Sequence, residues 1–358
     1  MLPDTMHRLP APALPPLHRL VTDLQDSSET TEKLGLEDRF RHARTGNAYE
    51  QSCVITAWQQ LYDQLCPGVF TGELKEMWLD ELQCFEETTS LALRQSCMVW
   101  PDAWWFGIPY TEGKAASNGY TPIDDDAIAV SAGGHEFELT TPDDFHIMGL
   151  VIRQHELETH AATELEGGLA LSVLGAPVLK VGRDKKRALI RTQQHLLGIA
   201  ARRPQDLHHP VSHRFARHEL LDQLIDLLAD AQALAAPRQS RSRGSHWRTV
   251  RTAREYVLDH PDEPVALADL CQHLHVSRRT LQNCFHNTLD ICPLGYLKAI
   301  RLNAVRRELL SPYSSHATIQ EAAFAWGFWH MSQFAVDYQR LFGEKPSASL
   351  RRGRALPG

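Results

Sequence analysis

The side chains best suited to chemistry in this chain of 358 residues follow Ser277, and they are polar types that form specific hydrogen bonds. Ser277 is of a type favoured at a helix N-terminus, because its hydroxyl can accept a hydrogen bond from an otherwise unpaired amide. A helix starting there carries one outward set of polar residues: Arg278, Arg279, Thr280, Gln282 and Asn283. Arg pairs bidentately with guanine, and Gln or Asn pairs with adenine. The pattern therefore predicts a base-reading helix, the alternative being a solvated polar face.

The elements that would position these residues occur twice. Apolar spacing predicts a short helix, a tight turn and a second helix over residues 267–286, and again over residues 319–342. Corresponding apolar positions are offset by 52 residues in the first helices and by 53 in the second ones, so the second turn is one residue longer. Two helices joined by a short turn form a helix-turn-helix, whose second helix enters the DNA major groove. The repeat therefore predicts that two helices of one chain bind in two successive turns of the DNA major groove.

The second of these base-reading helices is chemically poorer than the first. Its outward positions mix polar and apolar side chains: His330, Met331, Ser332, Gln333, Ala335 and Val336. We take His330, Ser332 and Gln333 as its DNA-contacting candidates, with apolar contact to thymine methyls and shape readout as supplements. We expect the first motif to dominate base discrimination.

A long apolar helix is predicted between the two pairs, over residues 293–310. Its length of roughly 25 Å, at ~1.5 Å per residue, could set the base-reading helices about one duplex turn, or ~34 Å, apart. Four basic residues lie on or beside it: Lys298, Arg301, Arg306 and Arg307. They could contact phosphates or form ion pairs with Asp269, Glu308 and Glu321, and the sequence leaves both open.

The charge distribution agrees with a DNA partner for the C-terminal part, although the whole chain carries −7. From Ser245 onward there are 14 Lys and Arg against 10 Asp and Glu, which is +4; subtraction from the totals of 37 and 44 leaves 23 against 34, or −11, before it. The basic excess therefore lies where the helix repeat lies, as a DNA-binding surface requires.

The preceding residues predict a different kind of domain. Residues 1–50 lack periodicity, and the spacing of apolar residues predicts a short helix over 55–65. Short alternating runs separated by turn signals predict strands over 70–152, followed by helices to residue 235. The stretch 237–244 is basic and Ser-rich, as linkers are.

The expected fold class is therefore multidomain α+β, with an N-terminal small β-barrel or sandwich plus helices and a C-terminal all-α tandem helix-turn-helix domain. We divide the chain into a weakly ordered arm, an effector-sensing or dimerisation domain, a linker and a DNA-binding domain, at residues 1–50, 51–236, 237–246 and 247–354.

Several function classes are disfavoured. The chain has no GxSxG, P-loop, HExxH or dinucleotide-binding glycine pattern, so we expect neither an enzyme nor a catalytic cofactor. No apolar run approaches the ~20 residues of a membrane helix. The N-terminus lacks a signal segment and the seven cysteines form no CxxC pair, so we expect a cytoplasmic protein with reduced thiols. Pro210 interrupts the helical i, i+4 alignment of the histidines at 208, 209, 213 and 218, and no Cys or acid completes the set until Glu219, so we expect no metal site.

Four stretches of the C-terminal domain resemble AraC/XylS-type bacterial transcription regulators: SRRTLQNCFH, RLNAVRREL, AAFAWGF and FAVDYQRLFGEKPS. The resemblance covers the whole C-terminal domain and implies that both base-reading helices insert into adjacent major grooves. It places Arg279, Gln282 and Asn283 at base-facing positions. The chain departs from the family where Met331 and two later apolar residues replace the usual polar side chains of the second helix.

Further stretches are similar to ethanolamine-utilisation operon regulators within that family: ITAWQQLYDQLCPG, LALRQSCMVWPDAWWFGIP, EFELTTPDDF and LCQHLHVSRRTLQNCFH. This resemblance implies an activator that binds promoter DNA, works with RNA polymerase and responds to ethanolamine and adenosylcobalamin, the latter as an effector. Two alternatives stay open. The chain could regulate another catabolic operon with a different effector, or its N-terminal domain could only form a homodimer.

A small cationic amino alcohol would need a carboxylate and aromatic faces. Five residues could supply them: Trp100, Asp102, Trp104, Trp105 and Glu136. Glu138 is a further acidic candidate, and the alternative is that the tryptophans are core and the acids are surface. Residues 144–149 spell DxHxxG, a pattern of cobalamin enzymes; here it leads into a predicted strand rather than an α/β loop, and we interpret it as coincidence.

Overall fold

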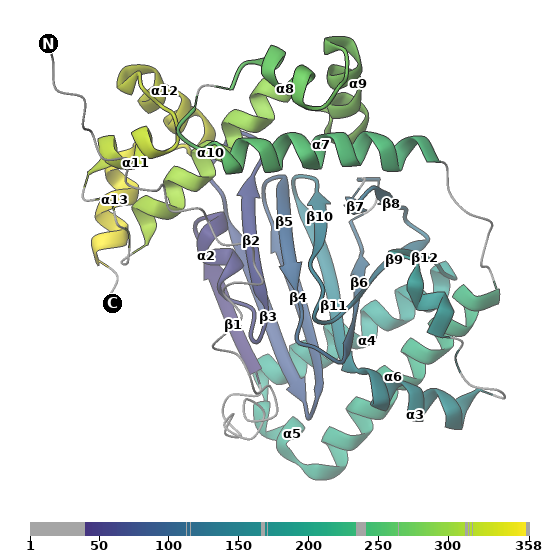
Figure 1. The fold of residues 1–358 in the computed structure, drawn as a ribbon. Helices are drawn as coiled ribbons and strands as arrows, with labels where there is room; N and C mark the ends of the chain where they lie inside the picture. The colour runs from purple at the N-terminus through teal and green to yellow at the C-terminus, as the bar shows by residue number, and fades with distance from the viewer. Residues whose placement is uncertain are drawn as a thin grey trace, which may run out of the picture. The chain divides into compact units, whose positions relative to one another are not determined.

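A computed structural model describes residues 40–111, 113–114, 116–165, 169, 171–233, 241–263, 265–311, 314, 316 and 318–355. They divide at residue 245 into an N-terminal and a C-terminal domain. The first is built on β-sheets with helices and the second is all-helical, which confirms the predicted fold class (Figure 1). No described helix is long and apolar enough to cross a membrane.

Two antiparallel sheets form the N-terminal domain (Figure 1). The larger sheet has seven strands in the order β1 (Phe40–Thr45), β3 (Gly72–Leu79), β4 (Leu82–Thr89), β11 (Phe145–Arg153), β6 (Ala103–Pro109), β9 (Ala127–Ala132) and β12 (Val178–Lys180). The smaller sheet has five, in the order β2 (Gln59–Gln64), β5 (Leu93–Met98), β10 (Phe137–Thr141), β7 (Ala116–Asn118) and β8 (Thr121–Ile123).

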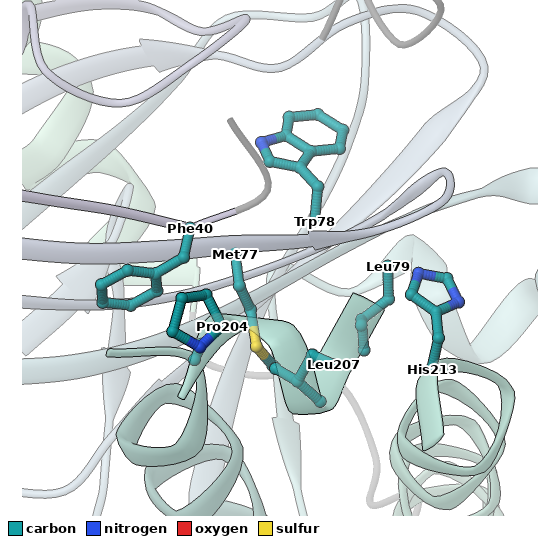
Figure 2. Close-up of a pocket in the computed structure, with 8 residues that line it drawn as sticks. Phe40, Met77, Trp78, Leu79, Pro204, Leu207 and His213 are labelled. Carbon is teal, nitrogen blue, oxygen red and sulfur yellow. The ribbon is translucent and has the colours of Figure 1, made fainter. Parts of the chain in front are cut away.

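Alternation along the strands of the larger sheet sends apolar side chains into different cores on its two faces. On β3, Met77 and Leu79 join the core under the helices, whereas Trp78 joins the core between the sheets. Figure 2 shows Met77 and Leu79 pointing toward the helices and Trp78 pointing to the opposite face. The pocket drawn there has a volume of only about 10 Å³, which is room for about one water molecule.

Helices cover one face of the larger sheet: α3 (Gln154–Glu164), the 3₁₀ turn η4 (Leu171–Gly175), α4 (Arg183–Arg202), α5 (Pro204–His208) and α6 (Pro210–Ala233). Helices α4 and α6 contact strands of this sheet, and α3 packs on α6. Leu157, Leu189 and Leu220 of these helices are fully buried. The helical layer is thus fixed to the sheet by an apolar interface.

The predicted helix over residues 55–65 is wrong. Ala57 has a φ of 61°, and the chain then enters β2, which pairs with β5. The apolar spacing has another cause: Trp58 packs edge-on against Phe85 and Trp105, with ring centroids 5.6 and 5.9 Å apart. Large residues in a loop and a short strand imitated helical periodicity.

Two predicted boundaries also need correction. The arm at 1–50 includes β1 and the start of α2 (Ala48–Ser52), because β1 pairs with β3 and Asn47 caps α2 through a 2.9 Å hydrogen bond from the Glu50 amide. Residues 1–39 lie outside the described residues. The predicted linker at 237–246 ends inside a helix, since α7 (Arg241–Asp259) begins within it; residues 237–240 lie outside the described part.

The C-terminal domain consists of seven described helices (Figure 1): α7, α8 (Leu267–His273), α9 (Arg278–Leu289), α10 (Pro293–Leu310), α11 (Ile319–Ala325), α12 (Met331–Phe342) and α13 (Pro346–Ala355). Helix α10 contacts α9 on one side and α11 and α13 on the other. Its buried residues enter both groups: Tyr296 meets Phe285 of α9 at 5.5 Å, and Val305 lies in one core with Phe334. The predicted central helix therefore exists and joins two lobes.

Candidate nucleic-acid interface

The first helix-turn-helix is α8 and α9, joined by four residues that include His275 in the left-handed conformation at φ 51°. Ser277 caps α9 as predicted, because its Oγ accepts a 3.1 Å hydrogen bond from the Thr280 amide. Leu281, Cys284 and Phe285 are buried. The polar candidates Arg278, Arg279, Thr280, Gln282 and Asn283 are all exposed.

Thr280 differs from the other candidates in one respect. Its hydroxyl lies 2.8 Å from the Ser277 Oγ, within hydrogen-bonding distance. This hydroxyl is therefore engaged at the helix cap. Arg278, Arg279, Gln282 and Asn283 are the longer side chains that can extend from this surface.

The second helix-turn-helix is α11 and α12, joined by five residues, so the predicted extra residue is present. Thr318 and Glu321 form a reciprocal capping box at the start of α11. Gly327 adopts φ 76° in the turn, and a Cβ there would lie 3.0 Å from both the Arg301 Nη1 and the Pro261 carbonyl oxygen. This turn therefore needs glycine for its backbone conformation and for space.

The outward face of α12 matches the sequence prediction in exposure. His330, Ser332 and Gln333 are exposed, together with Ala335 and Val336, while Met331 is half-buried. Trp329, directly before the helix, is 53% exposed and lies 5.2 Å from the Phe324 ring. An exposed tryptophan directly before α12 offers a flat apolar face to a partner. A tryptophan at this position of the sequence is the feature by which this surface could be recognised.

The basic residues of α10 make contacts within the domain. Lys298 pairs with Asp337 at 3.0 Å, Arg306 pairs with Glu344 at 2.8 Å, and Arg301 donates to the His260 and Glu263 carbonyl oxygens. Arg307 is buried. Of the two possibilities for these basic residues, contacts within the domain rather than free side chains for phosphates describe Lys298, Arg301 and Arg306.

The contacts described for Lys298, Arg301 and Arg306 are with groups other than the predicted Asp269, Glu308 and Glu321. Asp269 caps α8 by accepting from the Ala266 amide, and Glu321 caps α11. Glu308 accepts from the Ser314 hydroxyl and lies 3.4 Å from His316. Asp269 and Glu321 lie in the first turns of their helices, where unpaired backbone amides favour a carboxylate.

A basic surface on α13 was missed by the sequence reasoning. Arg351, Arg352 and Arg354 are exposed in its last turns, and Arg352 pairs with Glu344 at 2.9 Å. Helix α13 packs closely on α10, because a Cβ at Gly353 would lie 2.3 Å from the Leu309 carbonyl oxygen. The run of Arg residues near the C-terminus was the available signal.

The proposed effector residues do not form one cluster. Trp100 is buried and stacks on Trp78 at 5.2 Å, and Trp105 is buried and stacks on Phe137 at 4.7 Å. Asp102 is exposed in the turn before β6, at φ 59°. For these three residues the alternative reading, core tryptophans and a surface acid, describes their positions.

Trp104 and Glu136 do lie together. Both line a pocket of about 270 Å³ between β6, β9 and the segment that follows η4, with Ser131, His135 and Phe137. The Trp104 indole Nε1 is buried and has no hydrogen-bond partner among the described residues, and Glu136 accepts from the Ser96 hydroxyl. Glu138 is committed elsewhere, because the buried Arg94 donates to it at 2.9 Å. The pocket therefore offers one carboxylate, whereas the Trp104 Nε1 is shielded from solvent.

His146 of the DxHxxG stretch lies on β11, after Asp144 in a left-handed turn at φ 51°. Its Nδ1 lies 3.5 Å from the Tyr110 hydroxyl. The stretch thus opens a strand of an antiparallel sheet, and a strand setting differs from the α/β loop in which cobalamin enzymes carry this pattern.

Comparisons with known proteins agree with the described geometry. The helix-turn-helix domain family matches residues 270–352. The chain is 37% identical over 102 residues to the "Probable thc operon regulatory protein" of Rhodococcus erythropolis, a match covering 28% of this chain and 31% of that protein. It is 30% identical over 98 residues to the "XylDLEGF operon transcriptional activator 3" of Pseudomonas putida, covering 27% of this chain and 30% of that protein. The matches thus span about a third of these relatives' lengths.

A crystal structure of a probable AraC family transcriptional regulator from Rhodopseudomonas palustris is 30% identical, with a TM-score of 0.28, and covers 30% of this chain and 98% of that one. The family match begins at Leu270 in α8 and ends in α13, so it includes both helix-turn-helix pairs and the helix between them. Over residues 270–352 this chain therefore matches the helix-turn-helix domain family, and over about 100 residues it is similar to these two operon regulators.

Proposed function

We propose that this protein is a sequence-specific transcription regulator that binds promoter DNA through α9 and α12. The observation that carries the proposal is the exposed face of the capped helix α9, where Arg278, Arg279, Gln282 and Asn283 extend from one surface. These side-chain types discriminate guanine and adenine in the major groove. The similarity to operon regulators and a transcriptional activator supports the same activity, with RNA polymerase as the partner that an activator requires.

A footprint of the full-length protein on candidate promoters tests this function. We expect protection over two successive major grooves on one face of the duplex, because two base-reading helices lie in one domain. The experiment needs two salt concentrations, since phosphate contacts make affinity salt-dependent. Protection of one groove alone, or no preference over bulk competitor DNA, would contradict the proposal.

For the N-terminal domain we propose a small cationic effector, with ethanolamine as the compound that the sequence resemblance suggests. The pocket at Trp104 and Glu136 supports this choice, because a carboxylate and an aromatic face suit an ammonium group. Its volume of about 270 Å³ lies just below the range of drug-sized sites. Adenosylcobalamin is far larger, so its proposed effect on this protein would require a different surface.

Calorimetric titration of the full chain with ethanolamine, and separately with adenosylcobalamin, tests the effector. We expect Trp104→Ala and Glu136→Gln to weaken ethanolamine binding at least ~10-fold, which is about 1.4 kcal/mol. Trp329→Ala in the other domain is the control and should bind normally. No heat with either compound, together with a concentration-dependent homodimer in sedimentation, would favour a domain that only dimerises. Binding of a different small molecule would favour the regulator of another catabolic operon.

A further inference from the structure

Four potential metal ligands meet on the helical layer of the N-terminal domain, and none of them lines the pocket at Trp104. His160 and Glu164 are one helical turn apart on α3, and His218 and Asp222 are one turn apart on α6. Spacing of i, i+4 brings each pair to one face of its helix. Because α3 packs on α6, the two faces oppose each other and bring all four side chains together.

The ligand atoms already converge. One donor atom from each residue lies within 4.8 Å of the others. The His160 Nε2 lies 2.6 Å from the Asp222 Oδ1, and the His218 Nε2 lies 3.9 Å from that same oxygen. The two imidazole rings meet edge to face, with centroids 4.8 Å apart. A tetrahedral ion with bonds of about 2.0–2.2 Å holds its ligand atoms about 3.3 Å from one another. Side-chain rotations that move these ligand atoms by roughly an ångström would therefore complete the site.

The surroundings fit a divalent cation. His160 is 10% exposed and fixed in the helix interface, whereas the His218 side chain is 63% exposed and able to move. Among the described residues none forms a hydrogen bond or ion pair with the Glu164 carboxylate. Both α3 ligands lie in the last turns of their helix, where the unpaired carbonyls favour positive charge. Two carboxylates balance the charge of one divalent ion.

We propose that His160, Glu164, His218 and Asp222 bind one transition-metal ion of the Zn²⁺ class. Two imidazole nitrogens and two carboxylate oxygens suit Zn²⁺. Ca²⁺ and Mg²⁺ favour all-oxygen shells. The ion ties α3 to α6, and a ligand that binds the folded state stabilises that state. This site was not apparent from the sequence, because its ligands come from two helices distant in the chain. The sequence draws attention instead to the histidines at 208–218, of which His213 and His218 are five residues apart on a helix and so face different directions. His213 instead lies 3.8 Å from Asp80.

The test is calorimetric titration of untagged, metal-stripped full-length protein with ZnCl₂. We expect one tight equivalent in the wild type, and at least ~10-fold weaker binding in His218→Ala and in Glu164→Gln. Both positions are exposed, so these variants should fold. His195→Ala, which removes an exposed histidine of α4 outside the cluster, is the matched control and should retain the wild-type affinity.

Two further readouts separate a built site from incidental histidine binding. Zn²⁺ should raise the melting temperature of the wild type and of His195→Ala but not of His218→Ala. Co²⁺ should give the visible absorption bands of a tetrahedral ion, which are lost in His218→Ala. Equal Zn²⁺ affinity in all four proteins, absence of a tight equivalent in the wild type, or equal competition by Mg²⁺ would overturn the proposal.

Discussion

Single side chains set the chemistry of the exposed face of α9. The Ser277 cap begins α9 at Arg278 and also engages the Thr280 hydroxyl. The long side chains of Arg279 and Gln282 are exposed. All these residues were identified from the sequence, because capping chemistry and the apolar period fix which face of a short helix points outward. The roles assigned to individual DNA-contacting residues stay predictions.

Replacing Arg279 with Ala should cost ~1–3 kcal/mol in affinity for the operator and relax specificity at one base pair, because a bidentate contact to guanine would be lost. Measured affinity for operator and random duplex at fixed salt checks this. Arg191→Ala, at an exposed position of α4, should leave both affinities unchanged. An equal loss on random duplex would make Arg279 a phosphate contact.

Glu87 is a residue that sequence analysis did not single out. It is buried between the sheets, where Gln51 and the Tyr62 hydroxyl donate to it at 2.9 and 3.0 Å. Burial raises the pKa of this carboxyl from 4.5 to about 7, against the opposing effect of these hydrogen bonds. The burial of a carboxylate in an alternating strand cannot be predicted from the sequence, because it depends on which sheet packs against that face of the strand.

The folded protein therefore holds a proton on Glu87 that the unfolded chain releases near its pKa of 4.5. This contribution to stability is fully present below pH 4.5 and is lost as pH rises toward about 7. Glu87→Gln should remove this loss of stability, because glutamine does not ionise. The free energy of unfolding of the variant relative to the wild type should therefore rise by up to about 3 kcal/mol between a pH below 4.5 and pH 8. Urea unfolding at several pH values measures it, with the exposed Glu158→Gln as control. An unchanged pH dependence in Glu87→Gln would contradict the assignment.

At the level of elements, helices with a regular apolar period were predictable and short aromatic-rich segments were not. The helices α8 to α12 lie where the period placed them, including the longer second turn. Strand β2 was taken for a helix because Trp58 and its neighbours serve the contact between sheets rather than one helix face. Similarly, the ion-pair partners of α10 could not be predicted, since Arg306 and Glu344 are 38 residues apart.

Helix α10 connects the cores of both lobes, so breaking it should affect both. Ile300 is 1% exposed in its middle. Ile300→Pro removes a helix hydrogen bond and introduces a clash, and it should lower the free energy of unfolding by ~3 kcal/mol or more. Ile300→Val should cost only ~0.5–1.5 kcal/mol. Chemical denaturation compares them, and similar stability of the two variants would contradict the role of α10 as the connection.

For the molecule as a whole, the sequence predicted the two-domain arrangement through its change of period and charge. It could not place residues 40–52 in the β-domain, because a short edge strand has little pattern of its own until β3 pairs with it. It could not assemble the pocket at Trp104 or the cluster at His160 either, since each joins segments distant in the chain. Local patterns predict elements, whereas such sites depend on tertiary packing.

The difference of one residue between the two turns has a consequence for transcription. The two motifs of the C-terminal domain are unequal copies: four residues join α8 to α9 and five join α11 to α12, and arginine is exposed early in α9 while apolar residues take part of α12. Under the proposed function, a bound chain has a stringent end at α9 and a permissive end at α12, and reversing it on the duplex exchanges them. We therefore expect a single copy to recognise its site in one direction.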